Sequence, residues 1–519
     1  MVNAQIEIPA AAGRGWHAPL AGAFAWSYAN WALTILSPLV MVPLYIRFLG
    51  TQAYGEWIVI LSVSSYLSLA NLGLGQTLSN RIAEAAAVDR AHELRELIST
   101  AFFAYLALSA VIPAVLLLAA PRIVARLGVD SHYSALAAFG LYIALNLLSF
   151  PLRVHPMLLR GLERVDREQS INAATGIIRV MALAGALICG AKLIGIATIN
   201  GLAPVVAGAA AYIAARRITP AARPRWSRFS MRALRGMAKP SLAFFGIQAS
   251  ATLILGVDNL VIGYWLGSEA VTQYAVPFRL IMMAVAAFSV ALGALVPTIT
   301  TAHARGATTE LSRWLLLSTR AGLLYATASA VGLWILGPKI IRLWAGPGVF
   351  PGPLTFGLQI SALVLLIWVS SASALLWATT RHYQWSVLSI CEGALNVVLS
   401  LWWVRWWGMA GVVAATVAAS LVTESWYLPV TALRSLGIPL REAARELAPA
   451  VAICAATLVA VAVSFPLSAH APAWRDVLTK FFAVEVGFAV AFGVIALSHE
   501  DRARALAWLG FAARGADAI

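Results

Sequence analysis

The chain has 519 residues, of which 61% are apolar and only 11% are charged, and its mean hydropathy is +0.81. Soluble domains hold about 45–50% apolar and about 25% charged residues, so this composition excludes a soluble globular fold. The net charge of +15 would suit a nucleic-acid binder. However, the basic residues gather in short segments between apolar runs, where they orient a membrane protein and meet anionic lipids. We therefore expect anionic membrane lipids as partners, and no nucleic acid.

Apolar runs of the length that crosses a bilayer, about 20 residues, follow one another along the chain. We predict an all-α polytopic membrane protein with about 14 transmembrane helices, because backbone groups in lipid must be paired and no alternating barrel pattern is present. The predicted spans are 22–49, 57–80, 98–120, 133–159, 170–190, 193–215, 241–266, 275–301, 314–337, 354–380, 383–404, 409–431, 448–468 and 478–498.

The basic residues predict the orientation. Segments on the side of the two termini hold 25 Lys and Arg residues, and segments on the other side hold 8. Cytoplasmic segments carry the excess of Lys and Arg in membrane proteins, so we expect both termini in the cytoplasm.

Arg216–Lys239 is the most basic stretch, with eight Arg or Lys and no acidic residue. Trp226 and Phe229 recur at helical spacing on one face, with Arg228 and Arg232 on the opposite one. This pattern predicts an amphipathic helix in the plane of the membrane, between spans 6 and 7. A disordered basic linker is the alternative.

Two segments echo each other in sequence. FLGTQAYGEW (Phe48–Trp57) joins spans 1 and 2, and WLGSEAVTQY (Trp265–Tyr274) joins spans 7 and 8. The echo predicts two lobes of six helices each, related by a pseudo-twofold axis along the membrane normal. The predicted parts are a cytoplasmic tail (1–20), an N-terminal lobe (21–215), the basic linker (216–239), a C-terminal lobe (240–431), spans 13 and 14 (432–499) and a cytoplasmic tail (500–519).

Four blocks carry a family likeness: PLYIRFLGTQAYGEW from Pro43, IVILSVSSYLSLANLGLGQTLSNRIAE from Ile58, LILGVDNLVIGYWLGSEAVTQYAVPFRL from Leu253, and NVVLSLWWVRWWGMAGVVAATVAASLV from Asn396. The chain resembles the bacterial polysaccharide flippases (Wzx-type exporters of O-antigen and exopolysaccharide), within the multidrug/oligosaccharidyl-lipid/polysaccharide exporter superfamily. The resemblance implies a bacterial inner-membrane transporter that moves undecaprenyl-pyrophosphate-linked oligosaccharide to the periplasmic leaflet. It also implies a central cavity formed mainly by spans 1, 2, 7 and 8.

Charged residues within the spans are the candidate site. A charge at mid-bilayer costs about 2.5–3.5 kcal/mol, so it normally faces a cavity or a partner. Arg179, Arg279 and Arg47 are candidates for binding the substrate's pyrophosphate, because a guanidinium offers a bidentate fork. For Arg179 and Arg279, the alternative is that each forms a structural pair with another group of the protein. For Arg47, the alternative is a position at the membrane interface. Asp258 is the candidate for coupling or gating, or for an ion pair with Arg279.

Polar side chains of spans 1 and 2 would suit a sugar-lined cavity, because hydroxyls and amides both donate and accept hydrogen bonds. These candidates are Ser27, Asn30, Asn71, Gln76 and Asn80. They would equally suit hydrogen bonds between helices. Glu392 and Glu424 are further buried acids that could take up protons, with structural pairing as the alternative.

No catalytic set, metal-ligand spacing or nucleotide-binding loop is present in the sequence, so we expect a transporter without cofactor or metal. We expect a monomer, with polysaccharide polymerase and chain-length proteins as candidate partners implied by the resemblance. Two other functions stay open. One is a cation-coupled multidrug exporter of the same superfamily, and the other is a membrane glycan polymerase or ligase.

Overall fold

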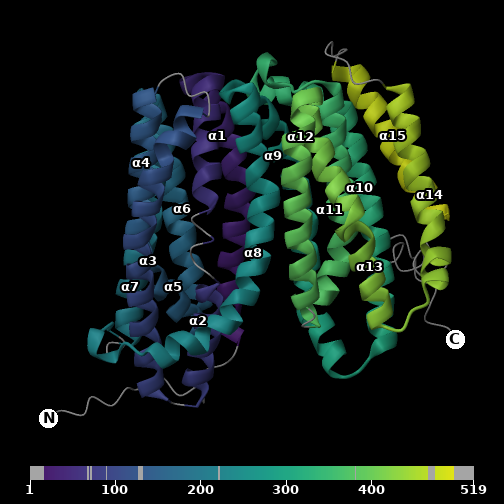
Figure 1. The fold of residues 1–519 in the computed structure, drawn as a ribbon. Coiled ribbons are helices and arrows are strands. Elements are labelled where there is room, and N and C mark those ends of the chain that lie inside the picture. The colour runs from purple at the N-terminus through teal and green to yellow at the C-terminus, as the bar shows by residue number, and fades with distance from the viewer. Residues whose placement is uncertain are drawn as a thin grey trace. The chain divides into compact units, whose positions relative to one another are not determined.

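The computed structural model describes residues 17–66, 69, 73–88, 90–126, 132–219, 223–379, 382–465 and 474–495, and the regular elements within them are all helices (Figure 1). The predicted all-α class is therefore confirmed. Contacts between Cα atoms divide the chain into two compact units, residues 1–272 and 273–519, which we call unit 1 and unit 2.

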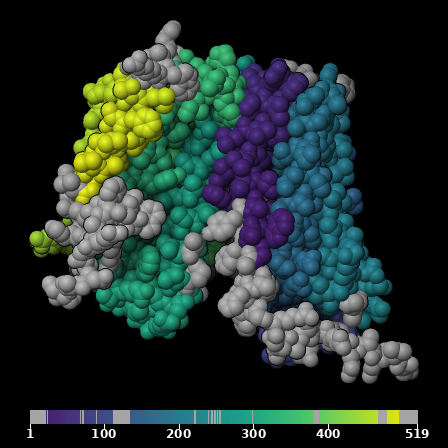
Figure 2. Space-filling model, turned by 180° about the vertical axis from the view of Figure 1, so that it is seen from behind, coloured from purple at the N-terminus to yellow at the C-terminus, as the bar shows by residue number. Residues whose placement is uncertain are grey.

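Unit 1 holds eight α-helices among its described residues. They are α1 (His17–Ser65), α2 (Leu74–Ala87), α3 (Ala91–Arg126), α4 (His132–Ser149), α5 (Val154–Gly161), α6 (Val165–Ile188), α7 (Leu193–Ile218) and α8 (Met231–Leu266). Two 3-10 turns join them, η2 (Pro151–Arg153) and η3 (Trp226–Arg228). The helices α1, α6 and α7 lie side by side on the face of unit 1 shown in Figure 2, α1 in purple and α6 and α7 in blue.

Unit 2 contains most of α9 (Ser268–Ala304) and the helices that follow it. These are α10 (Thr308–Ala345), α11 (Pro353–Ala378), α12 (His382–Val422), α13 (Glu424–Ser435), α14 (Leu440–Ser464) and α15 (Trp474–Ile495), with the 3-10 turn η4 (Pro347–Val349) after α10. The helices of the predicted spans 13 and 14, α14 and α15, both pack against α10. Phe488 and Phe492 of α15 are buried there with Leu323 of α10 and Cys454 of α14.

Within the described residues, eight helical segments are long and apolar enough to cross a membrane, or up to nine if the bent pair α4–α5 is one span. Two of these segments, Ala25–Ser65 and Val387–Ser435, each cover more than one predicted span. Both contain a glycine with non-helical backbone angles, Gly50 and Gly408, at the predicted turns. The number of 14 spans remains a prediction.

The two echoed segments share a backbone conformation. Gly50 has φ 84° and ψ 169°, and its counterpart Gly267 has φ 86° and ψ 172°. Side chains with a Cβ rarely adopt a positive φ of this size, so glycine is favoured at both turns. The segments also touch, because Thr272 Oγ1 donates a 2.6 Å hydrogen bond to the Thr51 carbonyl oxygen. A Cβ on Gly55 would lie only 1.8 Å from the Ser268 carbonyl oxygen.

The division between unit 1 and unit 2 follows Thr272, which is later in the chain than the predicted lobe boundary at residue 240. The helix α8 contacts α1, α2 and α3, and it therefore belongs to unit 1. The two-lobe repeat itself stays a prediction.

The prediction of one in-plane helix over Arg216–Lys239 is wrong. The helix α7 continues to Ile218, Arg225 is extended, and α8 begins only at Met231. The reason is tertiary, because the hydroxyl groups of Ser99 and Thr100 on α3 accept the backbone N–H groups of Arg225 and Ser230 at 3.2 and 3.1 Å. In Figure 1, the first turns of α8 cross the lower end of unit 1 before the helix turns upward.

Candidate functional site

Arg179 lies in the second half of α6, a helix of 24 residues that is apolar enough to cross a membrane. Its side chain is exposed, and it interacts electrostatically with the hydroxyl group of Tyr142 on α4. Among the described residues, no carboxylate forms an ion pair with Arg179. The described residues therefore do not include the structural carboxylate partner that was the alternative to substrate binding.

Arg153 is a second arginine beside Tyr142, which sequence reasoning missed. It lies within the predicted span 133–159, but we counted it among the basic residues of the cytoplasmic side and not as a candidate site residue. In the structure, Arg153 ends η2, the short turn between α4 and α5, and its guanidinium lies 4.2 Å from the ring centroid of Phe150. It interacts electrostatically with both Tyr105 and Tyr142. The apolar run that resumes at Val154 was the available signal that the chain had not yet left the helical bundle.

We call Tyr105, Tyr142, Arg153 and Arg179 the arginine–tyrosine cluster. Its members come from α3, α4, η2 and α6, so four separate elements of unit 1 build it. The Tyr142 ring packs edge-on against Trp57 at 5.3 Å between centroids, which fixes the hydroxyl relative to both arginines. Guanidinium groups bind phosphate oxygens through a fork of N–H donors, and a phenol can donate to phosphate or sugar oxygens. The cluster thus has the chemistry of an anion site.

The other two predicted arginines lie apart from this cluster in the sequence. Arg47 is exposed just before the Gly50 turn, 5.9 Å from the centroid of the Phe48 ring. Arg279 is exposed on α9, in unit 2. Because Asp258 belongs to unit 1, the predicted pair between Arg279 and Asp258 stays a prediction.

Asp258 is buried in α8, with 3% of its surface exposed. It interacts electrostatically with Tyr66, which follows α1, and the neighbouring Asn259 donates a 3.0 Å hydrogen bond from Nδ2 to Ser62 Oγ. Gly256 lies against the same part of α1, because a Cβ there would be 3.2 Å from Ser65 Oγ. Asp258 therefore lies in a polar contact between α8 and the end of α1, and its coupling role remains a prediction.

The predicted sugar-binding side chains have different surroundings. Asn30 Nδ2 donates to both the backbone oxygen and Oε1 of Gln169 on α6, at 2.8 Å each, so it joins two helices. Gln76 donates to Asn80 at 3.1 Å, and both are exposed on α2. Ser27 is exposed on α1, and Asn71 lies outside the described residues. Of the four described candidates, only Gln76 and Asn80 are joined by a hydrogen bond.

The two candidate acids Glu392 and Glu424 lie in unit 2. Thr423 Oγ1 donates a 2.5 Å hydrogen bond to Glu392, and Ser389 donates to Glu424, at the break between α12 and α13. A pocket of about 500 Å³ lies between α10, α11, α13 and α14, with a mainly apolar lining that includes Leu315, Trp368 and Val451.

Comparison with solved structures identifies the fold. The chain matches the lipid II flippase MurJ in an inward closed conformation, with a TM-score of 0.68 and 14% identity over 90% of this chain and 98% of MurJ. An inward-facing multidrug resistance MATE family transporter of the MOP superfamily matches with a TM-score of 0.63 and 16% identity, over 80% of this chain and 99% of that one. A MOP superfamily transporter from Pyrococcus furiosus, whose title reports a binding pocket of reverse polarity, has a TM-score of 0.51 and 16% identity, covering 81% and 93%.

These TM-scores and coverages establish a shared fold, that of MOP superfamily transporters, although the identities are low. The comparison with curated proteins gives no match. The comparison with protein families does, since the family described as polysaccharide biosynthesis protein matches residues 20–303, which are more than half of the 519 residues. The chain therefore belongs to the polysaccharide biosynthesis protein family.

Proposed function

We propose that the protein is a flippase that moves undecaprenyl-pyrophosphate-linked oligosaccharide across the bacterial inner membrane, for O-antigen or exopolysaccharide synthesis. Two lobes would alternate in access, and both termini would lie in the cytoplasm. The family match supports a role in polysaccharide synthesis, and the fold shared with transporters supports translocation rather than catalysis.

The observation that carries the proposal is Arg179. An arginine without a carboxylate partner, in the second half of an apolar helix, has a high free energy unless an anion or water reaches it. A pyrophosphate supplies the missing anion, and Arg153 lies beside the same tyrosine. The pyrophosphate would bind at the arginine–tyrosine cluster, while the polyprenyl tail stays in the lipid.

Energy for the movement would come from an ion gradient or from the membrane potential. The potential acts on a moving anion with about 2.3 kcal/mol per charge for each 100 mV. Asp258 is the candidate for ion coupling, Arg279 and Arg47 would contact the pyrophosphate along its path, and Gln76 and Asn80 would contact the sugars. The protein would act as a monomer and deliver its product to a polymerase and to chain-length proteins.

Arg179→Ala and Arg279→Ala test this function in the cell of origin. Each should abolish surface polysaccharide and cause the lipid-linked precursor to accumulate, as measured by mass spectrometry of extracted lipids. Arg217→Ala is the matched control, because Arg217 is exposed at the end of α7, away from the cluster. Normal polysaccharide in both variants, at normal protein levels, would contradict the pyrophosphate role. Transport of cationic dyes instead would favour a multidrug exporter.

A further inference from the structure

The pocket of about 500 Å³ in unit 2 has no part in the proposed transport function. It lies between α10, α11, α13 and α14, and its wall on α14 is a stripe of apolar residues. Residues three or four positions apart share one face of a helix, so this stripe forms a single face of α14. The residues of the stripe are Leu440, Ala443, Ala444, Leu447, Ala448 and Val451.

The polar side chains that line the pocket already have hydrogen-bond partners. Thr319 Oγ1 and Trp426 Nε1 each donate to a backbone carbonyl oxygen one turn earlier in the chain, at 2.7 and 2.8 Å. Trp368 Nε1 donates to the Ser425 carbonyl oxygen at 2.7 Å, and the hydroxyl groups of Ser425 and Ser420 are hydrogen-bonded at 3.2 Å. A polar ligand would gain little from such a lining, whereas an apolar cavity binds apolar molecules. The pocket therefore suits a hydrocarbon.

The volume of the pocket indicates which hydrocarbon fits. It lies within the range of about 300–1,000 Å³ that is usual for pockets that enclose one small ligand. In a bilayer, the acyl chains of phospholipids are the apolar chains that surround the protein. The undecaprenyl chain of the proposed substrate is much longer than an acyl chain, and a pocket of this volume would hold only part of it. One acyl chain is the better match.

The exposed lining residues mark the opening of the pocket. Trp426, Leu440 and Val451 line it and are 55%, 45% and 41% exposed. Ala444 and Ala448 of the stripe are exposed as well. The opening thus runs along α13 and α14, and both helices belong to segments that are apolar enough to cross a membrane. An acyl chain could therefore enter from the bilayer.

Two arginines border this opening. Arg441 and Arg445 are exposed, and each directly follows a residue of the stripe, which places it about 100° further around α14. Glu442 and Glu446 lie on another face of the helix, and Glu446 pairs with Arg320 of α10 at 3.1 Å. In the predicted orientation, this end of α14 faces the cytoplasmic leaflet, whose anionic lipids attract basic residues.

We propose that the pocket of unit 2 binds one acyl chain of an anionic phospholipid, whose phosphate group lies at Arg441 and Arg445. The chain would fill the space between α14 and the three other helices. This lipid site is separate from the arginine–tyrosine cluster of unit 1, and it does not depend on the transported substrate.

Native mass spectrometry of the full-length protein in detergent, titrated with phosphatidylglycerol, tests the pocket. Ala444→Phe places a ring at the opening and should weaken binding of the tightest phosphatidylglycerol about tenfold, since apolar pockets discriminate by this factor against small changes of fit. Ala452→Phe is the matched control, because Ala452 is exposed on the same helix about two turns further along and lies outside the stripe. If Ala444→Phe does not fold, Ala448→Phe makes the same test.

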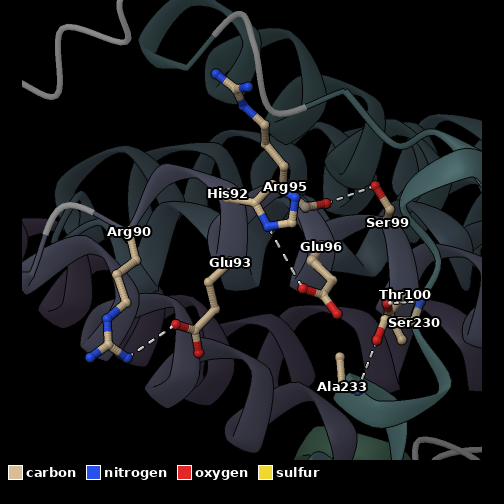
Figure 3. Close-up of polar contacts among 9 residues, drawn as sticks. All are labelled: Arg90, His92, Glu93, Arg95, Glu96, Ser99, Thr100, Ser230 and Ala233. Atoms are coloured by element: carbon tan, nitrogen blue, oxygen red, sulfur yellow. Dashed lines mark hydrogen bonds and ion pairs between the residues drawn. The ribbon is translucent and has the colours of Figure 1, made fainter.

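Arg441→Gln combined with Arg445→Gln tests the contact with the phosphate group. This variant should bind phosphatidylglycerol about tenfold more weakly and phosphatidylcholine unchanged, because basic residues attract anionic lipids. The control combines Arg90→Gln with Arg232→Gln, which removes the same charge from exposed positions of unit 1. Arg90 lies there 3.3 Å from Glu93 of α3 (Figure 3). The control should bind phosphatidylglycerol nearly as the unchanged protein does.

Four results would overturn the proposal. Equal binding by the Ala444→Phe and Ala452→Phe variants would show that the lipid does not use the pocket, and equal binding of phosphatidylglycerol and phosphatidylcholine would remove the phosphate contact. Displacement of phosphatidylglycerol by undecaprenyl phosphate at matched concentration would assign the pocket to the transported lipid. Binding that arises only when residues 496–519 are deleted would show that this part of the chain fills the pocket.

Discussion

Arg179 in unit 1 and Arg320 in unit 2 both lie within predicted spans, but they differ in exposure and in their carboxylate partners. Arg320 on α10 forms a 3.1 Å ion pair with Glu446 on α14, and its side chain is only 12% exposed. Arg179 on α6 is exposed and has no carboxylate partner among the described residues. Pairing lowers the cost of a charge in the membrane, and among the described residues only Arg320 of these two arginines has a carboxylate partner.

The acidic residues extend this comparison. In unit 2, Glu392 and Glu424 each accept a hydrogen bond from a Thr or Ser hydroxyl group near the α12–α13 break. In unit 1, the Arg160–Glu168 ion pair lies at the turn between α5 and α6, outside the apolar part of α6. Among the described residues, the apolar part of α6 therefore holds a positive group without a carboxylate partner, whereas Arg320, Glu392 and Glu424 of unit 2 have partners within the unit.

The largest expected effect concerns the contact between the two echoed segments within unit 1. Gly55→Ala places a Cβ 1.8 Å from the Ser268 carbonyl oxygen, which would push the start of α9 away from α1. We expect a loss of about 3 kcal/mol of stability, at the upper end for overpacking, seen as a lower melting temperature in detergent. Gly140→Ala is the control, because it has open space around it. An unchanged melting temperature for Gly55→Ala would contradict the close packing of α1 against the start of α9.

The second largest loss of stability is expected when the Arg320–Glu446 ion pair is broken. Glu446→Ala leaves Arg320 with one partner fewer and should cost about 1–2 kcal/mol, less than for a fully buried pair because Glu446 is 42% exposed. Arg320→Met combined with Glu446→Leu should recover most of this loss in the same melting experiment. No recovery in the double variant would show that the two side chains act independently.

A smaller loss of stability is expected when a hydroxyl group that donates to a carboxylate is removed. Thr423→Val removes the hydroxyl group that donates to Glu392 and should cost about 1 kcal/mol, the value of one hydrogen bond. Thr457→Val on α14 is the control, since that hydroxyl group donates only to the backbone of its own helix. Equal melting temperatures of the two variants would contradict a specific role for the Thr423 hydroxyl group.

The smallest effect on stability is expected at Arg179. Arg179→Met should change stability by less than about 0.5 kcal/mol, as for an exposed side chain without an ion pair, yet it should stop polysaccharide export. A melting temperature that falls as far as that of Glu446→Ala would make Arg179 a structural residue and remove the contrast between the units.

Several elements could be predicted from the sequence because their signals are local. Apolar runs predicted the helices, and the echo predicted matched turns at Gly50 and Gly267, which have nearly equal backbone angles. Arg179 was singled out because a charge in an apolar helix is visible without knowledge of its neighbours. Arg153 was missed because the η2 turn and the short helix α5 follow from packing against the rest of unit 1.

The sequence by itself determined the membrane class, the helical elements and the residues that carry charge into them, because the cost of placing polar groups in lipid acts on each segment separately. Only the tertiary structure decided which charges are paired. It joined Asn30 to Gln169 and placed Arg153 beside Tyr142. It also held Arg225–Ser230 against α3 as a 3-10 turn between extended residues, in place of the helix that the sequence pattern predicted. Each of these outcomes depends on a partner distant in the chain, which no local pattern reports.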